Sequence, residues 1–198
     1  RARDKPRRVP CHAAGLRTPR RTNLAMNLDQ ILVIDLEATC WSGDPPEGQE
    51  SDIIEIGLCT LEVATGRRLE KASFVVRPER SRVSRYCRAL TTLTQEEVEQ
   101  GISFREACSL LQTRYRSRER LWASFGDYDR LMFESECRTH EVEYPFCKGH
   151  INVKSLFAVV QILDRELPLD EAMDWLGFPL EGHHHRGEDD AWNIARIL

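Results

Sequence analysis

Apolar residues along the chain fall into short runs typical of strands and into longer spacings typical of helices. Three apolar or alternating runs rich in β-branched side chains occur, the first beginning with the four apolar residues 31–34 and the others covering 53–63 and 68–76. Such runs predict buried strands. The turn signal Ala-Thr-Gly-Arg at 64–67 separates the second run from the third. We therefore expect three consecutive strands in an antiparallel meander.

The second half of the chain alternates short strands with helices. The patterns Thr94-x-x-Glu97 and Ser103-x-x-Glu106 predict two helix starts of the capping-box type. A fourth and a fifth strand are expected at 121–125 and 150–153. Helical spacing predicts further helices after residue 129, over 154–163, over 169–176 and over 191–198.

The segment 77–90 between the third strand and these helices is rich in arginine. It holds five arginines, and Glu79 is its one acid. A solvated basic loop is the usual explanation, and contact with the phosphates of a nucleic acid is the functional alternative.

Two carboxylates end the first strand. Asp35 and Glu37 are separated by one residue, so the period of a strand places them on the same face. Like charges at a buried strand end repel each other and are costly to desolvate. A hard divalent cation with oxygen ligands would offset that cost. Two hydrated acids at a frayed strand end are the alternative.

Further acids and a histidine run occur at comparable places. Asp127 and Asp129 follow the fourth strand, at the end where ligands gather in open α/β sheets, although either residue also suits a helix N-cap. Asp190 lies in the first turn of the last helix, after three histidines at 183–185. Glu55, inside the second strand, is interpreted as a supporting carboxylate rather than a metal ligand.

If these carboxylates converge, they require cations. Two divalent ions about 3.5–4 Å apart would neutralise four carboxylates and clamp an in-line phosphoryl displacement. A nearby histidine would accept the proton of the attacking water, because its ordinary pKa suits neutral pH.

Composition and charge narrow the class of protein. The 198 residues suffice for one domain with a substantial core, and no apolar run approaches the length of a membrane span. Residues 1–25 carry eight basic residues and one acid, which leaves a net charge of −11 on the rest of a chain whose total is −4. An acidic body disfavours broad, charge-driven binding to duplex nucleic acid. Seven scattered cysteines without a C-x-x-C pair indicate free thiols in a reducing, cytoplasmic setting.

The basic N-terminal segment is expected to be disordered over residues 1–27, with the folded domain covering 28–198. It has few large apolar residues and three prolines. Three interpretations of this segment are open. It is an arm that contacts phosphate, a transit segment, or sequence upstream of a true start at Met26. We favour the last.

Three motifs resemble those of the DEDDh 3′–5′ exonuclease family. They are D-L-E-A-T-C-W at 35–41, G-D-Y-D at 126–129 and H-R-G-E-D-D-A-x-N-I-A-R at 185–196. Further stretches are similar to the Eri/KapD-like branch, namely I-I-E-I-G at 53–57, Y-C-R-A-L-T-T-L-T at 86–94 and I-N-V-K-S-L-F at 151–157. The resemblance covers nearly all of 28–198.

The resemblance implies an α/β, RNase H-like fold, a mixed five-stranded sheet with helices on both faces. It also implies a 3′–5′ exonuclease that uses two Mg²⁺ or Mn²⁺ ions. Asp35, Glu37 and Asp190 would hold the ion of the catalytic water, and Asp35 and Asp129 the second. Among the histidines, His185 has the family's spacing to Asp190 and would be the general base.

The substrate implied by the resemblance is the 3′ end of single-stranded RNA or DNA. Backbone groups of Leu36 and Ala38 would meet the terminal hydroxyl. Trp41, Leu93 or Tyr128 would stack or wedge against bases, although each suits a core position as well.

Two other functions are compatible with the sequence. One is a regulatory module that binds nucleic acid or protein on an exonuclease fold, and the other is a polymerase-associated proofreading subunit. The intact set of candidate catalytic residues favours the enzyme. The sequence identifies no protein partner and no membrane partner.

Overall fold

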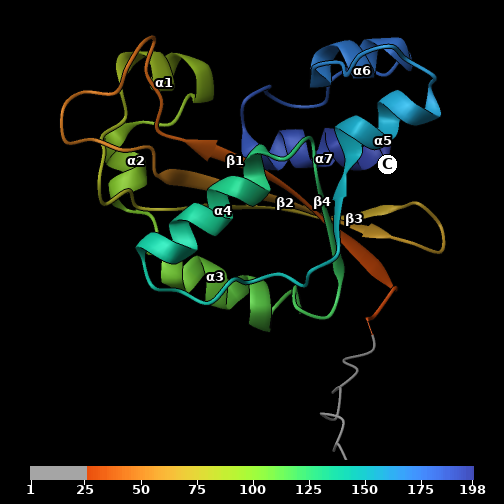
Figure 1. The fold of residues 1–198 in the computed structure, drawn as a ribbon, viewed down its shortest axis with the longest axis horizontal. Coiled ribbons are helices and arrows are strands. Elements are labelled where there is room, and N and C mark those ends of the chain that lie inside the picture. Colours follow the sequence, from red (N-terminus) through yellow and green to blue (C-terminus); the bar gives the residue numbers. More distant parts are fainter. Residues whose placement is uncertain (1–25) are drawn as a thin grey trace, which may run out of the picture.

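A computed structural model describes residues 26–198 and contains one mixed five-stranded sheet (Figure 1). Its strands are β1 (Gln30–Ala38), β2 (Ile53–Glu62), β3 (Arg68–Val75), β4 (Leu121–Ser124) and β5 (His150–Asn152). The spatial order is β3-β2-β1-β4-β5. The first three strands are antiparallel neighbours, whereas β4 runs parallel to β1, and β5 parallel to β4. The predicted meander and the predicted mixed sheet are both confirmed.

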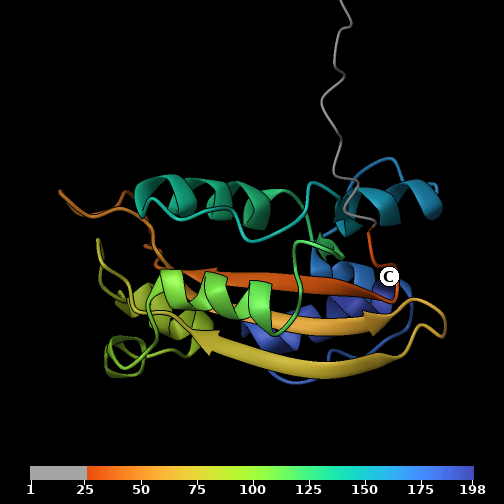
Figure 2. The ribbon, with the colours of Figure 1, turned by 90° about the horizontal axis from the view of Figure 1, so that it is seen from below.

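Helices cover both faces of this sheet (Figure 2). They are α1 (Arg85–Thr91), α2 (Gln95–Glu99), α3 (Phe104–Thr113), α4 (Tyr128–Thr139), α5 (Val153–Val160), α6 (Leu169–Trp175) and α7 (Gly187–Ile197). Helices α3 and α4 pack on one face, and α7 packs on the other. Both predicted capping boxes are present, at Thr94 before α2 and at Ser103 before α3.

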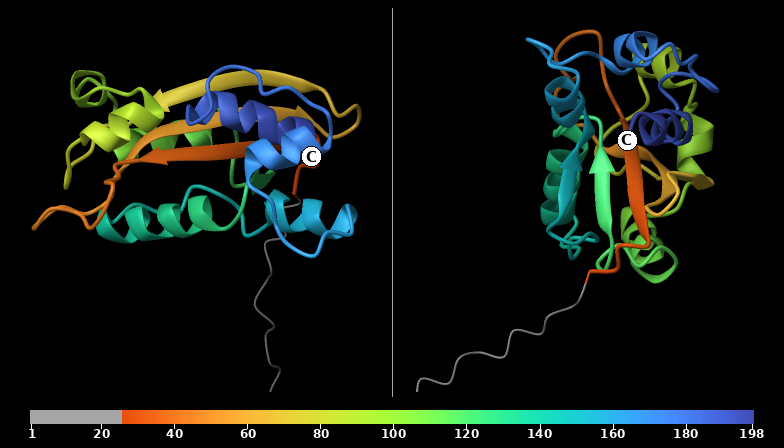
Figure 3. Two further views of the ribbon diagram at one scale, coloured as in Figure 1. Left: turned by 90° about the horizontal axis from the view of Figure 1, so that it is seen from above. Right: turned by 90° about the vertical axis from the view of Figure 1, so that its right-hand side faces the viewer.

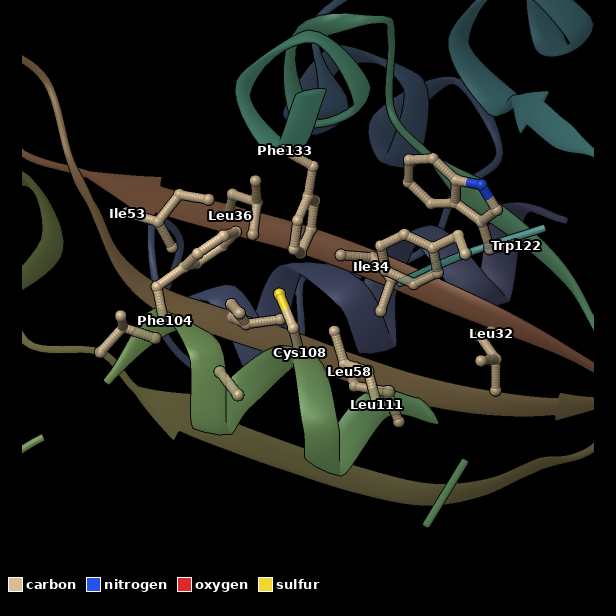
Figure 4. Packing of buried hydrophobic residues seen from close by; sticks show 14 of the residues in the cluster. Leu32, Ile34, Leu36, Ile53, Leu58, Phe104, Cys108, Leu111, Trp122 and Phe133 are labelled. Atoms are coloured by element: carbon tan, nitrogen blue, oxygen red, sulfur yellow. The ribbon is translucent and has the colours of Figure 1, made fainter. Parts of the chain in front are cut away.

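The alternation of side chains along β1 decides what each face does. Leu32, Ile34 and Leu36 point toward α3 and α4, where they join a buried cluster that includes Phe104 and Phe133 (Figure 4). Val33 points the other way and packs with residues of α7. Because the period of a strand is two, Asp35 and Glu37 continue the face of Val33 and lie on the side of α7.

The prediction of a basic loop over residues 77–90 was wrong. The segment 77–90 is not a loop throughout, because its second half forms α1. The Ser84 side chain caps this helix by accepting the N–H of Cys87 at 2.9 Å. Cys87 is fully buried, and its Sγ lies 3.6 Å from the carbonyl oxygen of Ala38 at the end of β1. A serine cap and two buried side chains, Cys87 and Thr91, therefore fold an otherwise exposed basic segment against the sheet.

The N-terminal segment and the question of membrane-spanning helices concern the chain as a whole. The predicted disordered segment 1–27 lies outside the described residues, except for its last two positions. Between residues 26 and 198 no helix combines the length and the apolar character that crossing a bilayer requires.

Candidate active site

Three carboxylates meet where β1 and α7 come together. Oxygen atoms of Asp35, Glu37 and Asp190 all lie within 4.8 Å of one another. Glu37 and Asp190 are buried, with 7% and 3% of their surface exposed. Strand β1 supplies the first two from one face, and the first turn of α7 supplies the third. The structure thus brings together residues that are far apart in the sequence.

Two glycines allow α7 to approach the sheet this closely. Gly57 on β2 pairs with Asp35, and a Cβ atom at Gly57 would lie 1.8 Å from the carbonyl carbon of Gly187. A Cβ atom at Gly187 would in turn lie 3.1 Å from the carbonyl oxygen of Asp35. The backbones of helix and sheet are therefore in direct contact. This contact sets the distance between Asp190 and the carboxylates of β1.

Glu55 fixes the same end of α7. Its side chain is fully buried and accepts the N–H of Gly187 at 3.0 Å and two N–H groups of Arg186 at 3.2 Å each. Ser73 donates its hydroxyl to Glu55 at 2.5 Å. These donors occupy the carboxylate, which supports the interpretation of Glu55 as a supporting group rather than a metal ligand.

Asp129 reaches the site from α4, on the other side of β1. It is 4% exposed, and its Oδ1 accepts the N–H of Leu36 at 2.9 Å. Asp127, in contrast, is half exposed and pairs with Arg130. Of the two acids that follow β4, Asp129 is therefore the one that the fold places beside Asp35.

The electrostatics of the cluster favour a bound cation. Burial, followed by the charge of Asp190, raises the pKa of Glu37 to about 9. Burial and the charge of Asp129 raise the pKa of Asp35 well above its ordinary value. Burial also raises the pKa of Asp129 to about 6. A compact set of carboxylate oxygens that resist ionisation without a counter-charge matches the donor chemistry of hard divalent ions.

The two histidines next to Asp190 differ in their contacts. The Nδ1 atom of His184 lies 3.0 Å from both carboxylate oxygens of Asp190, and this contact raises the pKa of His184. His185 donates its backbone N–H to Asp190 at 2.8 Å, and its ring stacks on that of His184 at 4.0 Å between centroids. Burial lowers the pKa of His185 and favours its neutral form. His185 also adopts a left-handed backbone, with φ of 65°.

The residues predicted to contact substrate differ in how exposed they are and in whether their backbone groups are already bonded. The side chain of Tyr128 is 57% exposed and that of Trp41 is partly exposed. Leu93 is 2% exposed within a core cluster, so it presents almost no side-chain surface to a base. The N–H of Leu36 is already donated to Asp129, and the carbonyl of Ala38 lies against Cys87. Their contacts with substrate stay predictions.

Comparison with known proteins identifies the class of protein. A family model described as exonuclease (RNase_T) matches residues 32–198. The chain belongs to this exonuclease family.

Within that class, the sequence is similar to the mouse 3′-5′ exoribonuclease 1, with 31% identity over 180 residues that represent 85% of this chain and 52% of the relative. It is also 27% identical over 176 residues to the probable 3′-5′ exonuclease KapD of Bacillus subtilis, covering 87% of this chain and 84% of the relative. The chain spans about half the length of the mammalian exoribonucleases 1 that it matches.

These relatives confirm the predicted branch, and a solved structure confirms the predicted fold. The nuclease domain of 3′hExo, described as a DEDDh family member bound to rAMP, superposes with a TM-score of 0.72 at 28% identity. The match covers 85% of this chain and 89% of that domain.

The close backbone contact between α7 and β2 predicts that Gly57→Ala is strongly destabilising. The added methyl group would overlap the backbone of Gly187, which has no flexible side chain to yield. We expect a loss of about 1–3 kcal/mol or more in urea unfolding, and a displacement of Asp190 from the carboxylates of β1, because Asp190 moves with α7. Gly43→Ala is the matched control, since nothing lies within 4 Å of a Cβ atom there. Equal stability of the two variants would contradict the proposed contact.

The raised pKa of Glu37 predicts a pH dependence of stability without metal. Between pH 4.5 and about 9 the folded protein holds a proton on Glu37 that the unfolded chain has released. Folding therefore takes up a proton, and stability falls as the pH rises through this range. In chelator, the melting temperature of the wild type should fall more steeply with pH than that of Glu37→Gln. Parallel slopes would show that Glu37 titrates normally in the fold.

Proposed function

We propose that this protein is a divalent-metal-dependent 3′–5′ exonuclease that removes nucleotides from single-stranded RNA or DNA. The observation that carries the proposal is the convergence of three carboxylates, with Asp129 alongside, at one end of the sheet. Buried acids with raised pKa values beside a histidine are typical of catalytic sites. Between residues 26 and 198, no arginine forms an ion pair with Asp35, Glu37 or Asp190. Two similar proteins, one from mouse and one from Bacillus subtilis, carry 3′-5′ exonuclease activities in their names.

The proposed metal ligands follow from the geometry and the family resemblance. Asp35, Glu37 and Asp190 would hold one ion, and Asp35 and Asp129 would hold a second. Mg²⁺ and Mn²⁺ suit this all-oxygen donor set. When bound, such ions neutralise charge on the phosphodiester and lower the pKa of attacking water.

His185 is the proposed general base. Its lowered pKa keeps the imidazole neutral near pH 7, so that a ring nitrogen can take the proton of the attacking water. His184 is the alternative, but its Nδ1 contacts the Asp190 carboxylate, which is one of the proposed metal ligands.

RNA is the first substrate to test. The mouse relative is named an exoribonuclease, and the similar nuclease domain of 3′hExo was solved with rAMP bound. A cytoplasmic setting is part of the proposal, since the six cysteines of the part of the chain seen in the structure are all free thiols.

We predict that Asp35→Ala abolishes cleavage but leaves the fold intact, because it removes one of several carboxylates that repel one another. The assay uses 5′-labelled single-stranded RNA and the matching DNA with Mg²⁺ or Mn²⁺, and circular dichroism checks the fold. The wild type should shorten the labelled strand from its 3′ end, and a chelator should stop this shortening. Full activity of Asp35→Ala would refute the site, and binding without shortening would favour a regulatory module.

We predict that His185→Ala slows cleavage by about 10²–10⁴-fold, the usual contribution of a general base. Calorimetric titration should show that the variant still binds Mn²⁺. The His185→Ala variant should also lose the acidic limb of the pH–rate profile. His184→Ala is the matched neighbour and should retain that limb. If His184→Ala loses the acidic limb instead, His184, whose ring contacts Asp190, is the general base. Loss of metal binding in His185→Ala would show that His185 is a metal ligand.

A further inference from the structure

An exposed row of arginines lies directly beyond the carboxylate site. The segment from Arg82 to Arg88 packs on the end of β1, where Ser84 donates its hydroxyl to the carbonyl of Cys40 at 2.6 Å. Cys87 of α1 contacts the carbonyl of Ala38, the residue that follows Glu37. Figures 1 and 3 show α1 and α2 together at the end toward which β1 points. This segment therefore forms part of the rim around the site.

The four arginines that follow Pro78 divide into two groups. Arg80 is held inside the protein by two buried acids, Asp52 and Glu136. Arg82, Arg85 and Arg88 are exposed, and none of them forms an ion pair with any residue between 26 and 198. Arginines elsewhere on the surface, such as Arg114, Arg116 and Arg118, are paired with glutamates. Three unpaired cations at one place are thus available to an external anion.

The arrangement of this row matches a flexible polyanion. Arg85 and Arg88 are one helical turn apart and share a face of α1, and Arg82 lies two residues before the Ser84 cap. Tyr86 follows Arg85 in the same helix and is 47% exposed. Guanidinium groups pair well with phosphate, and exposed aromatic rings stack on unpaired bases. The combination is the one by which proteins bind single strands without reading sequence.

We propose that Arg82, Arg85, Arg88 and Tyr86 form a track for the nucleotides upstream of the scissile bond in a single-stranded substrate. This inference rests on the proposed function, because it takes the carboxylates as the place of cleavage. The 3′-terminal nucleotide occupies the carboxylate site, and the strand leaves over α1, with its phosphates on the arginine row. The acidic remainder of the protein repels the strand elsewhere and so favours this path.

The test compares two triple variants of equal charge change. In the first, Arg82, Arg85 and Arg88 are changed to Gln, and in the control, Arg114, Arg116 and Arg118 are changed to Gln. The control arginines precede β4, at the opposite end of the parallel strands. Each protein is assayed on a dinucleotide and on a single-stranded RNA of about 16 nucleotides, the upper end of usual site sizes.

The track predicts a length-dependent defect. The first variant should raise KM for the long RNA about tenfold, as expected from losing three exposed ion pairs. It should leave kcat for the long RNA and all constants for the dinucleotide near those of the wild type. The slope of log KM against log salt should become shallower by about 2, because each phosphate contact on a single strand contributes about 0.7. The control variant should change none of these constants by a comparable amount.

The outcomes separate the track from the proposed function. Equal effects of the two triple variants on the long RNA, or an equal loss on the dinucleotide, would overturn the track while cleavage stands. If the wild type cleaves neither substrate, the proposed function fails, and the affinity of labelled RNA for the same three proteins still tests the row. In that case, an unchanged salt slope of binding in the first variant would overturn the track as well.

Discussion

Mutual repulsion of buried carboxylates is the constraint on which this structure depends. Asp35, Glu37 and Asp190 place their oxygens within 4.8 Å of one another, although burial opposes the ionisation of Asp35 and Glu37. The fold holds them there through contacts that do not involve the carboxylates of β1. The glycine contact brings α7 onto β2, and Glu55 binds the N–H of Gly187 and the side chain of Arg186. Packing free energy thus holds together acids whose repulsion is relieved by a proton, as on Glu37, or by a bound cation.

Strand β1 links this site to the rest of the domain. One face of the strand is buried against α3 and α4, and the other carries Val33 and then the two acids. Asp129 crosses between the two sides, since it belongs to α4 and accepts the N–H of Leu36. Movement of α4 or α7 relative to β1 would therefore directly change the distances among these carboxylates. The apolar core and the chemistry of the site are held by the same nine residues of β1.

Several features could be predicted because they depend on local periodicity. Alternation along β1 placed Asp35 and Glu37 on one face, and the capping boxes located α2 and α3. The family motifs pointed to Asp129 and Asp190, which the fold brings close to Asp35. Helix α1 was missed, because its two buried residues, Cys87 and Thr91, include only one apolar side chain and so leave no apolar periodicity. The contact of Gly57 with Gly187 depends on tertiary packing, which a local pattern does not encode. The same holds for Arg80, which looks like its exposed neighbours in the sequence but lies between buried acids. The contact of His184 with Asp190 depends on the left-handed backbone at His185, which no periodicity indicates.

The most direct test of this account is a crystal structure with Mn²⁺, in which anomalous scattering locates the ions independently of any substrate. The account predicts two peaks, one bound by Asp35, Glu37 and Asp190 and the other by Asp35 and Asp129. Peaks absent from these carboxylates, or found instead at the second acidic group of Asp52, Glu136 and His140, would contradict it. In the structure described here, Arg80 already neutralises that second group, so it should bind no ion.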